Sequence, residues 1–271
     1  MKYSILTSIY KSQPFLNSYF ETIFNQNVKP NEIILIDDTK NPENLVEILN
    51  NKKTKYGFNN IFIIHNEQNM GPAASLNKGL LKCSNNLIFR LDVDDQWLPN
   101  HTQKMLEFYN KDKNYLIYAN SLKKINFLTN LKCDPFFINE NHLIHSSWLI
   151  NRNICKDFKY HMITPSVALE DYFTLLYYIK KKFKIFFIYD LTTKYNQVAE
   201  SHGRINLTNI KYLKFRKLIS NLFLKLYFKE KNLLSFTYFF LREYGILRFI
   251  VFIFWIQDYF KFKKFYNKLK K

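Results

Sequence analysis

The chain has 271 residues, of which 47% are hydrophobic, with only 5 Gly and 7 Pro. This composition excludes a disordered or fibrous chain, and the length allows one large domain or one domain with an appendage. The formal net charge of +18 is unevenly distributed. Residues 204–271 contain 16 Lys and Arg against 3 acids, so residues 1–203 carry only +5. We therefore expect a nearly neutral body and a basic appendage that binds an anionic surface.

The cysteines give no sign of a metal site or a disulfide framework. Cys83, Cys133 and Cys155 lie far apart and lack CxxC spacing. We therefore expect reduced thiols in a cytosolic compartment. We identify no signal peptide. The most apolar stretch, residues 249–256, is far shorter than the roughly 20 residues that a membrane span needs.

Short apolar runs alternate with helical patterns over the first 120 residues, which predicts a doubly wound, mostly parallel α/β sheet. The predicted strands there span residues 3–9, 32–37, 61–65 and 86–91. The helices between them begin at an N-cap at Ser12 and cover 42–51 and 73–82. Farther along we expect strands at 115–120, 143–151 and 183–189, a helix at 170–182, and a helical tail after Gly203.

Polar or aromatic side chains follow three of the first four predicted strands. In parallel sheets of this type, ligands bind beyond the carboxyl ends of the strands. We therefore expect a ligand site at this edge, formed by Ser8 and Tyr10 after the first strand, Asp37 and Asp38 after the second, and Asp92, Asp94 and Asp95 after the fourth.

The acidic segment Asp92-Val93-Asp94-Asp95 is a candidate cation site. On an extended strand end, the side chains of Asp92 and Asp94 face the same way and can share one divalent cation. Mg²⁺ or Mn²⁺ held by carboxylates and diphosphate oxygens would neutralise the charge on a departing nucleoside diphosphate. The alternative is an acidic turn that caps the next helix.

The pair Asp37-Asp38 has two interpretations as well. A carboxylate at the end of a buried strand can accept the imide N–H of uracil or bind a ribose hydroxyl, and it can equally cap a helix ahead of Pro42. Tyr10 can stack on a base or simply pack against the protein. The loop from Asn69 to Gly79 is rich in small residues, which allows close backbone approach, but it lacks the ending of a phosphate-binding P-loop.

Glu170 and Asp171 open a predicted helix about 75 residues after the acidic segment. A carboxylate beside an acceptor hydroxyl would act as a general base, whereas acids in a first helical turn also favour the helix dipole without any catalytic role. His145 and His202 are further candidates, although lone histidines are more often structural or solvated.

The order and spacing of these motifs resemble glycosyltransferase family 2, in particular the branch that makes bacterial surface polysaccharides such as amylovoran. The resemblance covers roughly residues 3–205. It rests on Ser4-Ile5-Leu6-Thr7-Ser8-Ile9-Tyr10-Lys11, Ile36-Asp37-Asp38, Asn69-x-Gly71 through Leu76-Asn77-x-Gly79, Arg90-x-Asp92-x-Asp94-Asp95 and Glu170-Asp171-Tyr172.

The resemblance implies a GT-A fold in residues 1–203, a nucleotide-diphospho-sugar donor, UDP-linked by preference, and transfer with inversion to a hydroxyl of a glycan or lipid-linked glycan. Asp171 matches the catalytic base and Glu170 helps to hold the acceptor. The metal would be Mn²⁺ or Mg²⁺ on Asp92 and Asp94, with His202 near it. The residues implied in donor binding are Ser8, Tyr10, Asp37, Asp38, Asn77, Arg90 and Asp92.

The resemblance is incomplete at two places. The family's opening often reads Pro-Thr-Tyr-Asn, whereas this chain has Ser8-Ile9-Tyr10-Lys11. A basic residue is common near Tyr195, but here Asn196 and Val198 stand there, so neutralisation of the diphosphate would rest on the metal and Arg204.

The segment after residue 251 repeats apolar residues every three or four positions, with lysines on another face. This pattern predicts a basic amphipathic helix on an anionic membrane surface, or a helix packed on the body with a solvated lysine face. No nucleic-acid motif accompanies the charge. We expect a cytoplasmic protein, peripheral on the inner face of the cell membrane, that acts in lipooligosaccharide, capsule or related glycan synthesis.

Two rival functions fit parts of the sequence. A sugar nucleotidyltransferase also joins a parallel sheet to Mg²⁺ and nucleotides, but it usually needs a Gly-rich basic loop where this chain has Lys11-Ser12-Gln13-Pro14. A non-catalytic nucleotide-binding or scaffold protein of a membrane glycan-assembly complex would not need Asp92, Asp94 and Asp171, which are all present.

Overall fold

The computed structural model describes residues 1–39, 45–121, 143–161 and 170–194. A seven-stranded sheet runs through this part in the order β3-β2-β1-β4-β7-β6-β8. Within that sheet β7 alone is antiparallel to its neighbours β4 and β6. The strands are β1 (Ser4–Ile9), β2 (Glu32–Asp37), β3 (Ile61–His65), β4 (Leu87–Arg90), β6 (Ile117–Asn120), β7 (Leu149–Asn151) and β8 (Ile185–Ile188).

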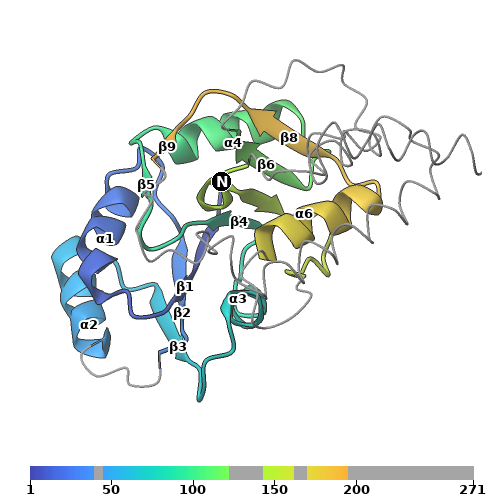
Figure 1. The fold of residues 1–271 in the computed structure, drawn as a ribbon. Coiled ribbons are helices and arrows are strands. Elements are labelled where there is room, and N and C mark those ends of the chain that lie inside the picture. Colours follow the sequence, from blue (N-terminus) through green and yellow to red (C-terminus); the bar gives the residue numbers. More distant parts are fainter. Residues whose placement is uncertain (40–44, 122–142, 162–169, 195–271) are drawn as a thin grey trace, which may run out of the picture. The chain divides into compact units, whose positions relative to one another are not determined.

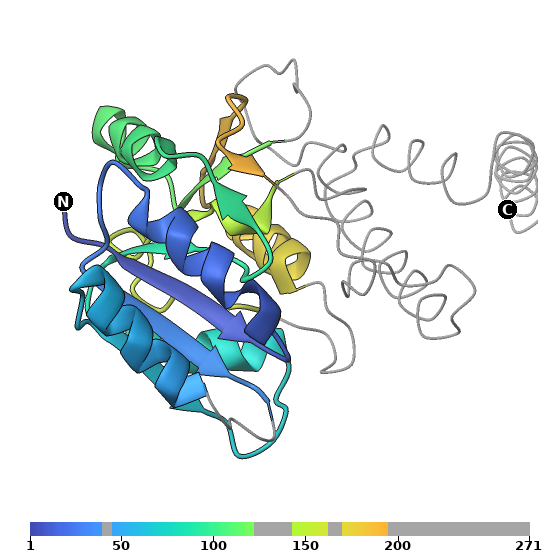
Figure 2. The same cartoon turned by 90° about the vertical axis from the view of Figure 1, so that its left-hand side faces the viewer.

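Helices cover both faces of the sheet (Figures 1 and 2). On one face lie α1 (Leu16–Phe24), which follows the 3-10 turn η1 (Gln13–Phe15), α2 (Leu45–Tyr56) and α4 (His101–Lys111). On the other lie α3 (Pro72–Leu80) and α6 (Glu170–Lys180). All six residues of β2 are buried, because a strand covered on both faces has no solvent side, and this explains its continuous apolar sequence. The predicted GT-A-type α/β sheet is confirmed.

Several predicted elements differ in the structure. Residues 143–151 form the 3-10 turn η2 (His145–Ser147) before a shorter strand, and α2 continues to Tyr56. Ser12 does not cap a helix through its side chain; its hydroxyl donates to the Tyr10 carbonyl at 2.9 Å. A second sheet of two strands, β5 (Gln96–Trp97) and β9 (Thr193–Lys194), was not predicted.

Helix α3 lies against β1 and β2 at Gly79. A Cβ atom added there would lie 2.3 Å from Leu6 Cδ1 and 2.9 Å from Ile36 Cγ1. Both neighbours are core side chains with almost no exposed surface. Glycine is therefore required for the close approach of the helix to the sheet.

We expect Gly79→Ala to lower the free energy of unfolding by about 1–3 kcal/mol, because the added methyl overpacks the core. The sign of the change in the free energy of unfolding is diagnostic, since Ala in place of Gly in an uncrowded helix interior stabilises a protein by about 1 kcal/mol. Urea unfolding followed by circular dichroism measures the change. A variant as stable as the wild type would contradict the close contact.

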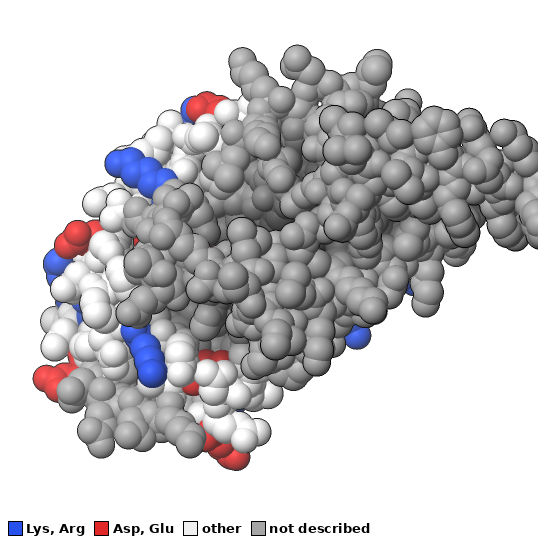
Figure 3. Space-filling model, viewed as in Figure 1, with Lys and Arg blue, Asp and Glu red and all other residues white. Residues whose placement is uncertain are grey.

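The structure shows the charge distribution of the described body but does not describe the basic tail. Figure 3 shows basic and acidic side chains interspersed around the described part of the face in view. Among the described residues, no helix is long and apolar enough to cross a membrane. The predicted tail at 204–271 lies outside the described residues, as does Cys133, while Cys83 and Cys155 are free thiols.

Candidate active site

The acidic segment follows β4 and forms a turn. The Asp95 N–H donates to the Asp92 carbonyl at 3.2 Å, and the Val93 side chain between them is buried. The predicted extended strand end is therefore wrong, because β4 stops at Arg90. The turn leaves 35% of the Asp92 side chain exposed at the carboxyl edge of the sheet.

Arg90 lies beneath this turn with a guanidinium that is only 1% exposed. Its Nη1 donates to the carbonyls of Leu6 and Leu91, and its Nη2 donates to Asp92 Oδ1. Burial alone would raise the pKa of Asp92, but the Arg90 charge, the neighbouring His145 and the hydrogen bonds from Ser146 and Arg90 together outweigh it and hold that pKa below its usual value. Asp92 is thus a carboxylate at neutral pH. The structure shows Arg90 supporting Asp92, and its predicted part in donor binding stays a prediction.

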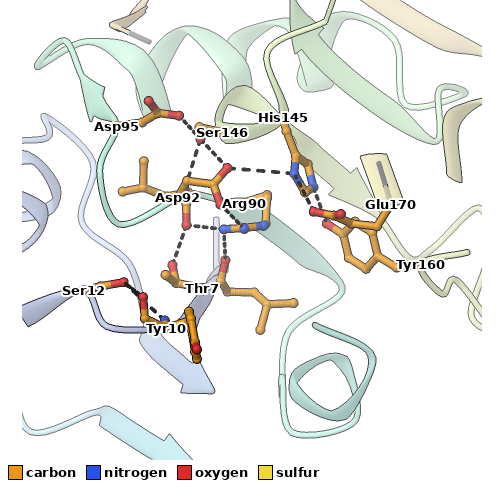
Figure 4. Close-up of polar contacts among 12 residues, drawn as sticks. Thr7, Tyr10, Ser12, Arg90, Asp92, Asp95, His145, Ser146, Tyr160 and Glu170 are labelled. Atoms are coloured by element: carbon orange, nitrogen blue, oxygen red, sulfur yellow. Dashed lines mark hydrogen bonds and ion pairs between the residues drawn. The ribbon is translucent and has the colours of Figure 1, made fainter. Parts of the chain in front are cut away.

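The turn η2 approaches the acidic turn from a distant part of the chain (Figure 4). The Ser146 hydroxyl lies 2.9 Å from Asp92 Oδ2 and also contacts Asp95 Oδ2. In return, the Asp92 N–H donates to Ser146 Oγ at 3.1 Å. Sequence analysis singled out His145 on this turn but not Ser146, because a serine 54 residues away in the chain carries no motif.

His145 joins the acidic turn to α6. Its Nδ1 lies 3.9 Å from Asp92 Oδ2 and 3.8 Å from Glu170 Oε1, and its Nε2 lies 3.4 Å from the Tyr160 hydroxyl (Figure 4). Burial, with the Arg90 charge, lowers the pKa of His145 to about 3. The imidazole is therefore neutral at physiological pH, and these approaches are polar contacts of a neutral ring.

Glu170 and Asp171 form the first turn of α6, as predicted. Burial, together with the charge of Asp171, raises the pKa of Glu170 to about 8. At neutral pH Glu170 therefore keeps its proton and can donate a hydrogen bond. A strongly raised pKa on a buried carboxyl group is typical of acid–base sites.

The start of α6 is fixed by the segment before it. The His161 N–H donates to Thr174 Oγ1 at 2.8 Å, and the Lys159 N–H donates to the Tyr178 hydroxyl at 2.8 Å. The rings of Phe158 and Tyr178 stack with their centroids 4.8 Å apart. These contacts attach the second and third turns of α6 to residues 158–161.

Asn77 ties the same segment to α3. Its Nδ2 donates to the Tyr160 carbonyl at 2.9 Å, and its Oδ1 accepts the Tyr160 N–H at 2.7 Å. Because both ends of the amide bond to the backbone of Tyr160, the structure shows Asn77 as an anchor between α3 and the segment before α6. The predicted contact of Asn77 with the donor stays a prediction.

The carboxyl ends of β1 and β2 carry the remaining predicted residues. Asp37 is fully buried; it accepts the Thr39 N–H at 3.0 Å and lies 3.0 Å from His65 Nδ1. Ser8 is half-buried, and the Tyr10 ring is 42% exposed. Tyr10 therefore presents an aromatic face at this edge.

Asp38 organises the loop that enters α3. Its carboxylate is 4% exposed and accepts the N–H groups of Met70 and Gly71, each at 2.8 Å, and the Asn66 amide at 2.9 Å. A ligand could therefore contact Asp38 only through the small part of the carboxylate that is not already hydrogen-bonded to these donors.

The acidic turn fits a divalent cation only with help from a ligand. Burial, with the charge of Asp92, raises the pKa of Asp94, so a cation bound at the turn would favour the ionised form of Asp94. Within the described ranges, no group of three or more His, Cys, Asp or Glu is placed to hold a metal. Two carboxylates completed by diphosphate oxygens match the way proteins hold Mg²⁺. His202 lies outside the described residues.

The comparisons with known proteins identify the family. The sequence model of glycosyl transferase family 2 matches residues 4–169. The chain belongs to this family.

Two proteins similar to this family-2 glycosyltransferase have a named substrate or product. The chain is 32% identical over 128 residues to UDP-Gal:alpha-D-GlcNAc-diphosphoundecaprenol beta-1,3-galactosyltransferase of Escherichia coli, a match that covers 46% of each chain. It is 30% identical over 108 residues to the amylovoran biosynthesis glycosyltransferase AmsE of Erwinia amylovora, covering 39% of this chain and 40% of that one. Both matches span less than half the length of the relative.

Two solved structures share the fold. Staphylococcus aureus TarS in complex with UDP-GlcNAc superposes with a TM-score of 0.60 at 15% identity, over 81% of this chain and 65% of that one. The mannosyltransferase PcManGT of Pyrobaculum calidifontis, in complex with GDP-Man and Mn²⁺, gives a TM-score of 0.58 at 12% identity, over 74% and 58%. These likenesses establish the GT-A fold.

Proposed function

We propose that this family-2 glycosyltransferase transfers a sugar from a nucleotide-diphospho-sugar, most simply a UDP-sugar, to a hydroxyl of a glycan or lipid-linked glycan in the synthesis of a bacterial surface polysaccharide, lipooligosaccharide or capsule. The observation that carries the proposal is the convergence of the acidic turn and the start of α6, with Asp92 and Glu170 each within 4 Å of the same His145 ring. This arrangement supports a donor site and a base on opposite sides of one reaction centre.

The two acids of α6 take different roles in this reaction. We assign Asp171 as the general base that removes the proton of the acceptor hydroxyl as the oxygen attacks the anomeric carbon. Glu170, protonated at neutral pH because its pKa is about 8, donates a hydrogen bond that holds the acceptor. A single displacement of this kind inverts the anomeric carbon and forms no covalent intermediate with the protein.

Asp92 and Asp94 would hold Mn²⁺ or Mg²⁺ together with the donor diphosphate. When bound, the cation supplies Lewis-acid neutralisation of the leaving group. Arg90 stabilises the charge of Asp92 from below, and the Tyr10 ring is exposed where a base would stack. A UDP donor is supported by the UDP-Gal donor of the Escherichia coli relative and by the UDP-GlcNAc bound to TarS.

We place the protein at the inner face of the cell membrane. The basic segment 204–271, with its lysine-bearing amphipathic pattern, would bind anionic lipids and bring the site to a lipid-linked acceptor. The undecaprenol-linked acceptor named for the Escherichia coli relative supports this location.

The test is release of nucleoside diphosphate from a panel of UDP-, GDP-, dTDP- and CMP-sugars, with Mn²⁺ or with EDTA. We expect release from one donor, and its loss in EDTA. Because hydrolysis without an acceptor is slow, extracted lipid-linked glycans are added as acceptors in a parallel series. A folded protein that binds UDP by calorimetry but turns over no donor in either series would instead support a non-catalytic role.

A further inference from the structure

Ser146 is a fully buried hydroxyl on which both ends of the acidic turn converge. Its Oγ contacts Asp92 Oδ2 at 2.9 Å and Asp95 Oδ2, and it accepts the Asp92 N–H at 3.1 Å. Asp92 begins the turn and Asp95 ends it, so one side chain outside the turn binds both of its ends. Asp94 lies between the two fixed points.

The position of Ser146 is itself fixed from two sides. The Trp97 indole N–H donates to the Ser146 carbonyl at 2.6 Å. The next residue, Ser147, accepts the Asn120 N–H at 2.8 Å and donates to the Ile144 carbonyl at 2.6 Å. The turn η2 is thus held to β5, the strand before α4, and to β6. Ser146 therefore presents its hydroxyl to the carboxylates from a rigid support.

We propose that Ser146 is a positioning residue that holds the acidic turn in the geometry that binds the divalent cation. The inference rests on the proposed function. A hydroxyl carries one proton, and here two carboxylate oxygens compete for it, so the contact orders Asp92 and Asp95 relative to each other. Groups that orient metal ligands in this way typically change metal affinity 10- to 100-fold when removed, on the order of the effect expected here.

The chain offers a matched control on the same turn. Ser146 and Ser147 are both fully buried serines, and each loses a hydroxyl that bonds to two or more groups when replaced by Ala. The two differ in what they contact. Ser147 bonds to backbone groups of β6 and of Ile144, the residue before η2, whereas Ser146 bonds to the acidic turn.

The experiment compares full-length wild type, Ser146→Ala and Ser147→Ala. Calorimetry of Mn²⁺ binding at saturating UDP gives the cation affinity, and urea unfolding gives the stability. We expect both variants to unfold at lower urea, and Ser146→Ala alone to bind Mn²⁺ about 10-fold or more weakly. If Ser146→Ala does not fold, Ser146→Cys keeps the shape with a weak thiol donor, and it too is expected to weaken Mn²⁺ binding.

Equal Mn²⁺ affinity in wild type and the Ser146 variant would overturn the inference and leave the proposed function standing. Equal weakening in Ser146→Ala and Ser147→Ala would also overturn it, because that result reflects general loosening of η2. A wild-type protein that binds no Mn²⁺ with UDP would overturn the cation site and this inference together.

Discussion

Asp171→Asn is expected to lower kcat for sugar transfer by about 1000-fold, within the range that removal of a general base produces. Asparagine keeps the shape of the side chain but cannot accept the proton of the acceptor hydroxyl. The KM for the donor should stay unchanged, since the base acts on the acceptor. Steady-state release of nucleoside diphosphate at saturating donor and acceptor measures both constants.

Glu170→Gln is the matched control for that variant. Below pH 8 the wild-type Glu170 is protonated, and as the pH rises through about 8 it loses the proton with which it holds the acceptor. Wild-type activity should therefore fall above this pH. Glutamine donates a hydrogen bond at every pH, so the variant should retain activity at pH 7 and lose the alkaline fall. A large loss at pH 7 in Glu170→Gln, with activity preserved in Asp171→Asn, would reverse the two assignments.

Asp94→Asn is expected to abolish the gain in UDP affinity that Mn²⁺ provides, a loss on the order of 100-fold. The amide keeps the size of the side chain but removes a charged oxygen ligand. The same change should make the protein slightly more stable, because burial and the charge of Asp92 already disfavour ionised Asp94. Calorimetry with UDP, with and without Mn²⁺, measures the first effect and urea unfolding the second.

Glu107→Gln controls for the lost charge. Glu107 is an exposed acid on α4, so its replacement changes net charge equally but leaves the acidic turn intact. It should bind UDP and Mn²⁺ as the wild type does. If Asp94→Asn retains the full Mn²⁺ effect, Asp94 is not a ligand.

The parallel half of the sheet was predictable because its strands are buried on both faces. β2 reads as an uninterrupted apolar run ending in Asp37, and its bounds match the prediction. By contrast, α4 was missed. Its inward face includes His101 and Thr102, which are fully buried polar residues, so the helical spacing of Met105, Leu106 and Tyr109 was too short to recognise.

The candidate site was predicted at its strand ends but not in its connections. Local sequence correctly placed Asp92 after a strand and Glu170 and Asp171 in the first turn of a helix. It did not show that Arg90 is buried under Asp92 or that Asn77 bonds to Tyr160, because such pairings depend on tertiary contacts. The turn η2 illustrates the same limit, since its buried serines are satisfied by partners 27 and 54 residues away.

The contact between Asn77 and Tyr160 has a consequence for how such enzymes diversify. The amide bonds only to main-chain atoms of residue 160, so the attachment does not depend on which side chain stands there. The junction between α3 and the segment that leads into α6 can therefore persist through a change at residue 160, provided that the new side chain fills the buried space between Trp148 and Phe158.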